Sequence, residues 1–157
     1  MQPDYSKWHD TIVDILRQTA MDVSTQIALV PEYVRPTDDI AENVEYALML
    51  CETLAKVGAV SPRTVAVLTP IHAVMERHSG KADPAFWTHE SLANHRDWTQ
   101  VRESARMELV ALGHELRPPS LNWVTYVPGE LPARGNEPGS DAKDPDSTRR
   151  ANADPES

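Results

Sequence analysis

Cysteine is almost absent from this sequence: Cys51 is the only one among 157 residues. A single thiol excludes an internal disulfide, a zinc ribbon and any multi-cysteine cluster within the chain. Basic side chains are also scarce, with 15 Lys and Arg against 24 Asp and Glu and a net charge of −9, which argues against a nucleic-acid partner. No apolar run reaches the roughly 18 residues that a membrane span needs. No signal sequence opens the chain, so we expect a cytoplasmic protein with no membrane partner.

The short motifs of common catalytic and cofactor sites are missing as well. The sequence contains no G-x-G-x-x-G, no P-loop, no G-x-S-x-G and no H-E-x-x-H. It has no Glu-x-x-His pair, which excludes the di-iron signature of helical bundles. We therefore expect no catalytic residue, no metal ligand and no cofactor in this chain.

The six histidines are scattered along the chain. His72 and Glu76 lie four residues apart and could face one site, whereas His78 is two residues further along and points elsewhere on a helix. His89 and His95 are six residues apart, which rotates their imidazoles by about 240° around a helix. Such spacings are typical of surface or helix-end histidines. A stand-alone enzyme would need a cleft that gathers His72, Glu76 and His89.

Apolar residues recur at helical spacing up to Gly113. Trp8 and Ile12 share one stripe with Ile15 and Leu16, which we expect to face the core, while Arg17 falls on the solvent side of this helix. The clearest stripe runs for four turns from Ile40 to Ala55. Cys51 falls on that apolar face, where a thiol behaves as a small hydrophobe. The stripes predict helices over residues 4–21, 37–58, 61–80, 84–93 and 97–113. The expected fold class is mainly α, a small orthogonal bundle of four to six helices.

Proline and glycine mark the expected helix ends. Gly58 suits a left-handed C-cap, and Ser61 followed by Pro62 suits the start of the next helix. Pro70 is expected to kink or restart that helix. The helix–turn–helix spacing around Gly58 also resembles a DNA-binding motif, but the second helix offers only Arg63 as a basic residue near its start, so we do not favour this reading.

The end of the chain differs from the helical part. Residues 121–127 have the β-branched and aromatic enrichment of a strand, which would lie extended on the helices or add to a partner's sheet. Trp123, Tyr126 and Val127 are therefore candidate interface residues. Proline, glycine and charged residues dominate from Pro128, which predicts a helical domain over 1–127 and a disordered tail over 128–157.

One segment resembles a known family. Residues 48–62, with Leu54, Lys56, Gly58 and the Ser61-Pro62 pair, are similar to a helix–glycine–helix segment of nitrile hydratase and thiocyanate hydrolase subunits, and the run from Asp83 to Phe86 is similar to a segment further along that family. The family's metal centre uses a Cys-x-x-Cys-Ser-Cys cluster, which this chain lacks. The resemblance therefore implies a non-catalytic, β-like subunit or accessory protein, whose partner subunit holds cobalt or iron.

The first functional hypothesis is thus a docking subunit in a hetero-oligomer of hydratase-like type, inactive when alone. The second is a helical interaction or regulatory module with no enzyme partner. The two differ in whether the partner carries the cysteine cluster of a metalloenzyme.

Overall fold

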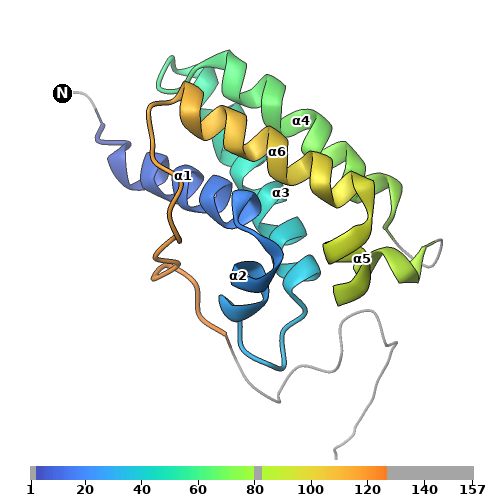
Figure 1. Ribbon diagram of the computed structural model, residues 1–157. Helices are drawn as coiled ribbons and strands as arrows, with labels where there is room; N and C mark the ends of the chain where they lie inside the picture. Colours follow the sequence, from blue (N-terminus) through green and yellow to red (C-terminus); the bar gives the residue numbers. More distant parts are fainter. Residues whose placement is uncertain (1–2, 80–82, 127–157) are drawn as a thin grey trace, which may run out of the picture. The chain divides into compact units, whose positions relative to one another are not determined.

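The computed structural model describes residues 3–79 and 83–126 (Figure 1). The chain divides into two units, Met1–Val124 and Thr125–Ser157, and only Thr125 and Tyr126 of the second are described. The first unit is helical, and no strand occurs in the described ranges, which confirms the mainly α class. Its elements are α1 (Ser6–Ala20), α2 (Val23–Ala28), α3 (Pro36–Lys56), α4 (Pro62–Arg77), the 3₁₀ helix η2 (Pro84–Trp87), α5 (His89–Asn94) and α6 (Arg96–Ala111).

The four long helices form a bundle. Helix α1 packs against α3 and α6, and α4 packs against the same two helices, so that the apolar core lies among all four. Helix α5 and η2 close one end of the core, where Phe86 and Trp98 are buried. Core residues include Ile15, Leu16, Ile40, Val44, Leu54, Leu68, Leu92 and Leu109.

The helix boundaries follow local sequence signals closely. Gly58 has φ +74° just after α3, as expected for a left-handed C-cap. At the start of α4 the Ser61 hydroxyl oxygen accepts a hydrogen bond from the backbone N–H of Arg63 at 3.1 Å, and Pro62 occupies the first helical position. Helix α4 nevertheless continues through Pro70, so the expected restart is wrong. Because Pro70 is exposed, water can bond to the carbonyl that proline leaves without a donor.

Two predicted elements have different bounds. The helix expected over 84–93 is divided at Thr88, whose extended backbone separates η2 from α5 and whose hydroxyl oxygen accepts from the backbone N–H of Ser91 at 3.1 Å. Helix α6, predicted to start at Asp97, starts at Arg96 and is capped by His95. Gly80, predicted to end α4, lies outside the described residues.

Two side chains of α1 are placed differently from the prediction. Trp8 was expected in the core but is 41% exposed, because its position precedes the part of α1 that faces the bundle. Arg17 was expected on the wet side but is buried, and its Nε donates a hydrogen bond to the Glu115 carbonyl at 3.1 Å. The C-terminal segment therefore covers this face of α1.

The strand prediction is wrong for residues 121–126. Leu121 has φ +50°, and a turn follows it, so the backbone cannot continue as a strand. The segment instead returns along α1, where Ser120 Oγ and Trp123 Nε1 both donate to the Asp14 carboxylate at 3.0 and 3.2 Å. Ser120 and Trp123 thus lie against α1, but the backbone between them is not extended as the prediction required. Val127 and the predicted tail over 128–157 lie outside the described residues. Among the described helices, none has the length and apolarity required to cross a bilayer.

Candidate functional site

Cys51 is a packing residue, as the sequence predicted. Its side chain is fully buried, and burial raises the pKa of the thiol to about 12, with the nearby carboxylates of Glu108 and Glu52 acting in the same direction. A buried thiol that stays protonated at neutral pH is a poor nucleophile and a poor metal ligand.

Of the three residues required for a stand-alone enzyme, only His72 and Glu76 form a contact in the described part of the chain. His72 Nε2 and Glu76 Oε2 are 3.7 Å apart on α4, an i, i+4 pair at the surface. No hydrogen bond or ion pair links His89, at the start of α5, to either of them in the described part of the chain. An open groove of about 610 Å³ lies elsewhere, between α1 and the start of α4. Its polar lining includes His9, Asp10, Ser61, Thr64 and His114.

One of the predicted interface residues, Trp123, contacts an exposed aromatic residue of α3. Tyr46 and Met49 lie one helical turn apart on α3 and are 39% and 51% exposed. The ring of Trp123 lies against Tyr46, with 6.4 Å between ring centroids, and it also packs against the core. We call Tyr46, Met49 and Trp123 the α3 patch. Tyr126, another predicted interface residue, is half-buried in the second unit.

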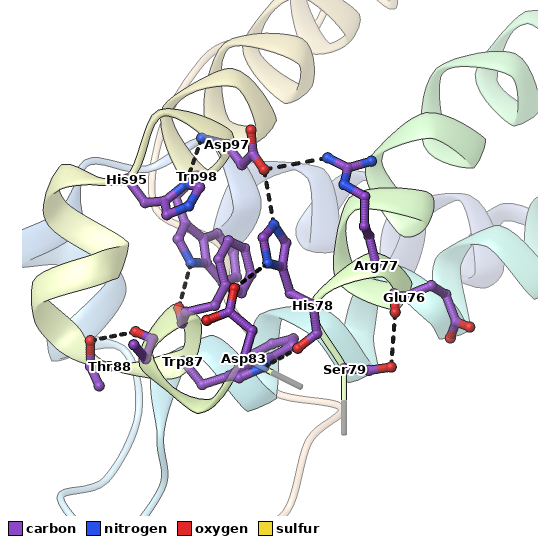
Figure 2. A network of polar contacts seen from close by, with 12 residues as sticks. Glu76, Arg77, His78, Ser79, Asp83, Trp87, Thr88, His95, Asp97 and Trp98 are labelled. Atoms are coloured by element: carbon purple, nitrogen blue, oxygen red, sulfur yellow. Dashed lines mark hydrogen bonds and ion pairs between the residues drawn. The ribbon is translucent and has the colours of Figure 1, made fainter. Parts of the chain in front are cut away.

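A second cluster joins the end of α4 to the starts of η2 and α6 (Figure 2). His78 is the C-cap of α4, and its ring lies between two carboxylates: Nδ1 is 2.7 Å from Asp83 Oδ2, and Nε2 is 2.9 Å from Asp97 Oδ2. Arg77 donates to the same Asp97 oxygen at 3.3 Å. Hydrogen bonding from His78, followed by that from Arg77, holds the pKa of the Asp97 carboxyl below its usual range. We call His78, Asp83, His95 and Asp97 the α4–α6 cluster.

Aromatic packing holds the α4–α6 cluster in place. The His78 ring stacks on Phe86 with 3.7 Å between centroids and 5° between planes, and Phe86 stacks in turn on Trp98. Trp98 Nε1 donates to the Phe86 carbonyl at 3.0 Å, and Trp87 Nε1 donates to the His78 carbonyl at 2.8 Å. These contacts tie η2 to both long helices.

His95 completes the α4–α6 cluster from the start of α6. Its Nδ1 accepts a hydrogen bond from the backbone N–H of Asp97 at 3.0 Å, which caps the helix. Its ring meets the His78 ring edge-on, with 5.4 Å between centroids. One potential ligand atom from each of His78, His95 and Asp97 lies within 4.8 Å of the others, so these three residues are able to hold a metal ion.

Sequence reasoning missed the α4–α6 cluster. It correctly separated His78 from His72 and Glu76, but it compared His95 only with His89. The sequence signal that could have found the cluster is the position of these residues at helix ends. His78 ends one helix, His95 begins another, and Asp83-Pro84 begins the 3₁₀ helix between them. Only the packing of these ends brings the side chains together.

Comparison with models of protein families, with curated proteins and with solved structures gave no match to this chain.

Proposed function

We propose that the chain is a non-catalytic docking subunit, a helical domain that binds a partner protein through the α3 patch and does not turn over a substrate alone. The observation that carries the proposal is the exposed contact of Tyr46 with Trp123, next to the exposed Met49. Tyr, Trp and Met are enriched in the centres of protein interfaces.

The α3 patch is built to keep its shape on binding. The indole of Trp123 packs against the core, and its N–H donates to Asp14 on α1. Tyr46 projects from the middle of α3 and lies against that indole. Aromatic side chains held in this way lose little conformational freedom when a partner binds, so more of the contact energy appears as affinity.

The chemistry of the described residues supports a non-catalytic role. The thiol of Cys51 is buried, and none of His72, Glu76 and His89 lines the groove between α1 and α4. The polar side chains of the groove make no hydrogen bonds to one another in the part of the chain that is described, and the hydroxyl of Thr64 is bonded instead to the buried carboxylate of Glu108 at 2.8 Å.

The proposed partner is a metalloenzyme subunit that carries the Cys-x-x-Cys-Ser-Cys cluster and holds cobalt or iron. Residues 48–62, which resemble nitrile hydratase and thiocyanate hydrolase subunits, include Met49 of the α3 patch and the turn at Gly58. The proposed assembly is a hetero-oligomer in which the present chain supplies a surface rather than a metal centre.

The test is affinity purification of the full chain from its native cells, with elemental analysis of the complex and identification of co-purifying proteins. A partner with the cysteine cluster and bound cobalt or iron is expected with the unaltered chain. The double variant Tyr46→Ser/Met49→Ser should lose it, because both side chains are exposed and their loss removes contact area without opening the core. The matched control Met107→Ser/Val110→Ser removes two exposed apolar residues of α6 and should retain the partner.

Each other outcome has a definite meaning. A partner of another class that depends on Tyr46 and Met49 would replace the hydratase assignment with the interaction-module hypothesis. A partner held equally by both double variants would remove the α3 patch from the proposal. Hydrolysis or hydration of a nitrile or thiocyanate by the purified chain alone would overturn the non-catalytic role.

A further inference from the structure

We propose that His78, His95 and Asp97 bind a divalent transition-metal ion, with zinc as the test case. One ligand atom from each residue lies within 4.8 Å of the other two. Two imidazoles and one carboxylate form a donor set that suits zinc and its neighbours in the first transition series. The inference departs from the sequence-based expectation that this chain holds no metal, and it does not depend on the docking proposal.

Asp83 supplies the orientation that a metal-binding histidine needs. Its carboxylate oxygen lies 2.7 Å from His78 Nδ1 and accepts the Nδ1 proton, so Nε2 is the nitrogen that can bind the ion once the proton between Nε2 and Asp97 has left. A carboxylate on the far nitrogen of a ligating histidine fixes the tautomer and makes the ring a stronger donor. Asp83 is therefore a positioning residue for the ion and not a ligand.

In this proposal the ion binds between His78 Nε2 and Asp97 Oδ2, which are already in close contact. Nε2 and Oδ2 are 2.9 Å apart, a distance at which the two atoms share a proton. A metal ion binding both atoms takes the place of that proton, which passes to solvent. Arg77 donates a hydrogen bond to the same Asp97 oxygen at 3.3 Å. When the ion binds, this hydrogen bond either breaks or shares the oxygen with the ion.

Of the three ligands, His95 contributes least to the affinity for the ion. Its Nδ1 lone pair accepts the backbone N–H of Asp97, and one lone pair cannot serve both this hydrogen bond and a metal ion. Binding through Nδ1 gives up the bond, and binding through Nε2 requires the tautomer in which Nδ1 is protonated. In either case the helix cap is exchanged for the metal bond.

The surroundings favour a stable site. Phe86 stacks on the His78 ring, and the side chains of His78 and Asp97 are only 14% and 22% exposed. An apolar wall on one side strengthens the attraction between carboxylate and cation, while the exposed part gives the ion a way in. Three protein ligands leave at least one position for water.

The test uses the full chain after treatment with a chelator, with Zn²⁺ as the probe. Calorimetric titration should give one zinc per chain, and elemental analysis after dialysis should find the same stoichiometry. His78→Phe keeps an aromatic ring on Phe86 but has no ligand atom, and it should lose stoichiometric zinc. Asp83→Asn should bind zinc about 10–100-fold more weakly, the usual effect of losing such a positioning group. His95→Ser keeps a helix-capping oxygen and should weaken binding less than His78→Phe does.

The control is a second histidine–carboxylate pair on the same helix. His72 and Glu76 lie at the surface of α4, 3.7 Å apart, and the double variant His72→Phe/Glu76→Gln should bind zinc as the unaltered chain does. Circular dichroism of each variant checks that the helices are intact. Less than one zinc per chain, zinc retained by a folded His78→Phe variant, or zinc lost on changing His72 and Glu76 would each overturn the assignment.

Discussion

A buried hydrogen bond between α4 and α6 is expected to contribute to the stability of the fold. Thr64 Oγ1 donates to Glu108 Oε2 at 2.8 Å, and both residues are 1% exposed. The other oxygen, Glu108 Oε1, has no hydrogen bond within the described residues, and its ion-pair partner is Arg63 at 3.4 Å. The carboxylate therefore depends on the Thr64 hydroxyl for its one short contact.

Thr64→Val removes that hydroxyl and puts a methyl group of similar size in its place. A hydrogen bond to a charged group contributes about 1.5–3 kcal/mol, and a buried acceptor left without a donor loses this amount in full. We expect the free energy of unfolding to fall by about 2 kcal/mol, measured by urea denaturation followed by circular dichroism. The double variant Thr64→Val/Glu108→Leu removes both partners and should be more stable than Thr64→Val alone, since no buried carboxylate remains unsatisfied.

Thr69→Val on the same helix is the matched control. Its hydroxyl donates to the Val65 carbonyl at 2.8 Å at an exposed position, so its loss should change the free energy of unfolding by no more than about 0.5 kcal/mol. If Thr64→Val costs no more than Thr69→Val, or if Glu108→Leu destabilises the double variant further, then the buried carboxylate is not the group that makes Thr64 important.

Two further predictions concern titrating side chains. The Thr25 backbone N–H holds the pKa of Asp22 below its usual range, so the charged cap of α2 contributes stability above the ordinary carboxyl pKa and loses it as the pH falls through the lowered value. Asp22→Asn should keep the cap but lose this part of the acid dependence in urea titrations below about pH 5, and parallel acid curves for the two proteins would contradict the reasoning. Because burial raises the pKa of Cys51 to about 12, a thiol reagent at about pH 8 should react only after the chain is unfolded in urea, and rapid reaction with the folded chain would show that Cys51 is accessible.

Helix boundaries were the most predictable part of the fold. The signals at Gly58, Ser61 and Pro62 are local, because each acts on backbone groups within four residues of itself. The apolar stripe from Ile40 to Ala55 was equally informative, since a helix long enough to repeat its pattern over four turns leaves little ambiguity about its buried face.

The segment over 121–126 could not be assigned in this way. Its β-branched and aromatic residues are common in strands, but strand propensity has meaning only where a neighbouring strand is available for pairing. Here α1 offers Asp14 instead, which binds Ser120 and Trp123, and the positive φ of Leu121 turns the backbone toward these contacts. The same C-terminal segment also covers Arg17. Its burial could not be predicted from the pattern of α1, because its Glu115 partner is 98 residues away in sequence.

The candidate metal site could not be predicted from the sequence, for a related reason. Helical periodicity reports which face of a helix is buried, and it carries no information about which helix ends meet. His78 ends α4, Asp83 precedes η2 and His95 precedes α6, so none of them belongs to an apolar stripe. What joins them is the stack of Phe86 on Trp98, two residues that the stripes assign only to a core. In a helical chain without cysteine pairs or a metal motif, the side chains that begin and end the helices are therefore the ones to examine for chemistry. Their spacing in sequence is set by the connecting segments rather than by the ligand geometry of the ion.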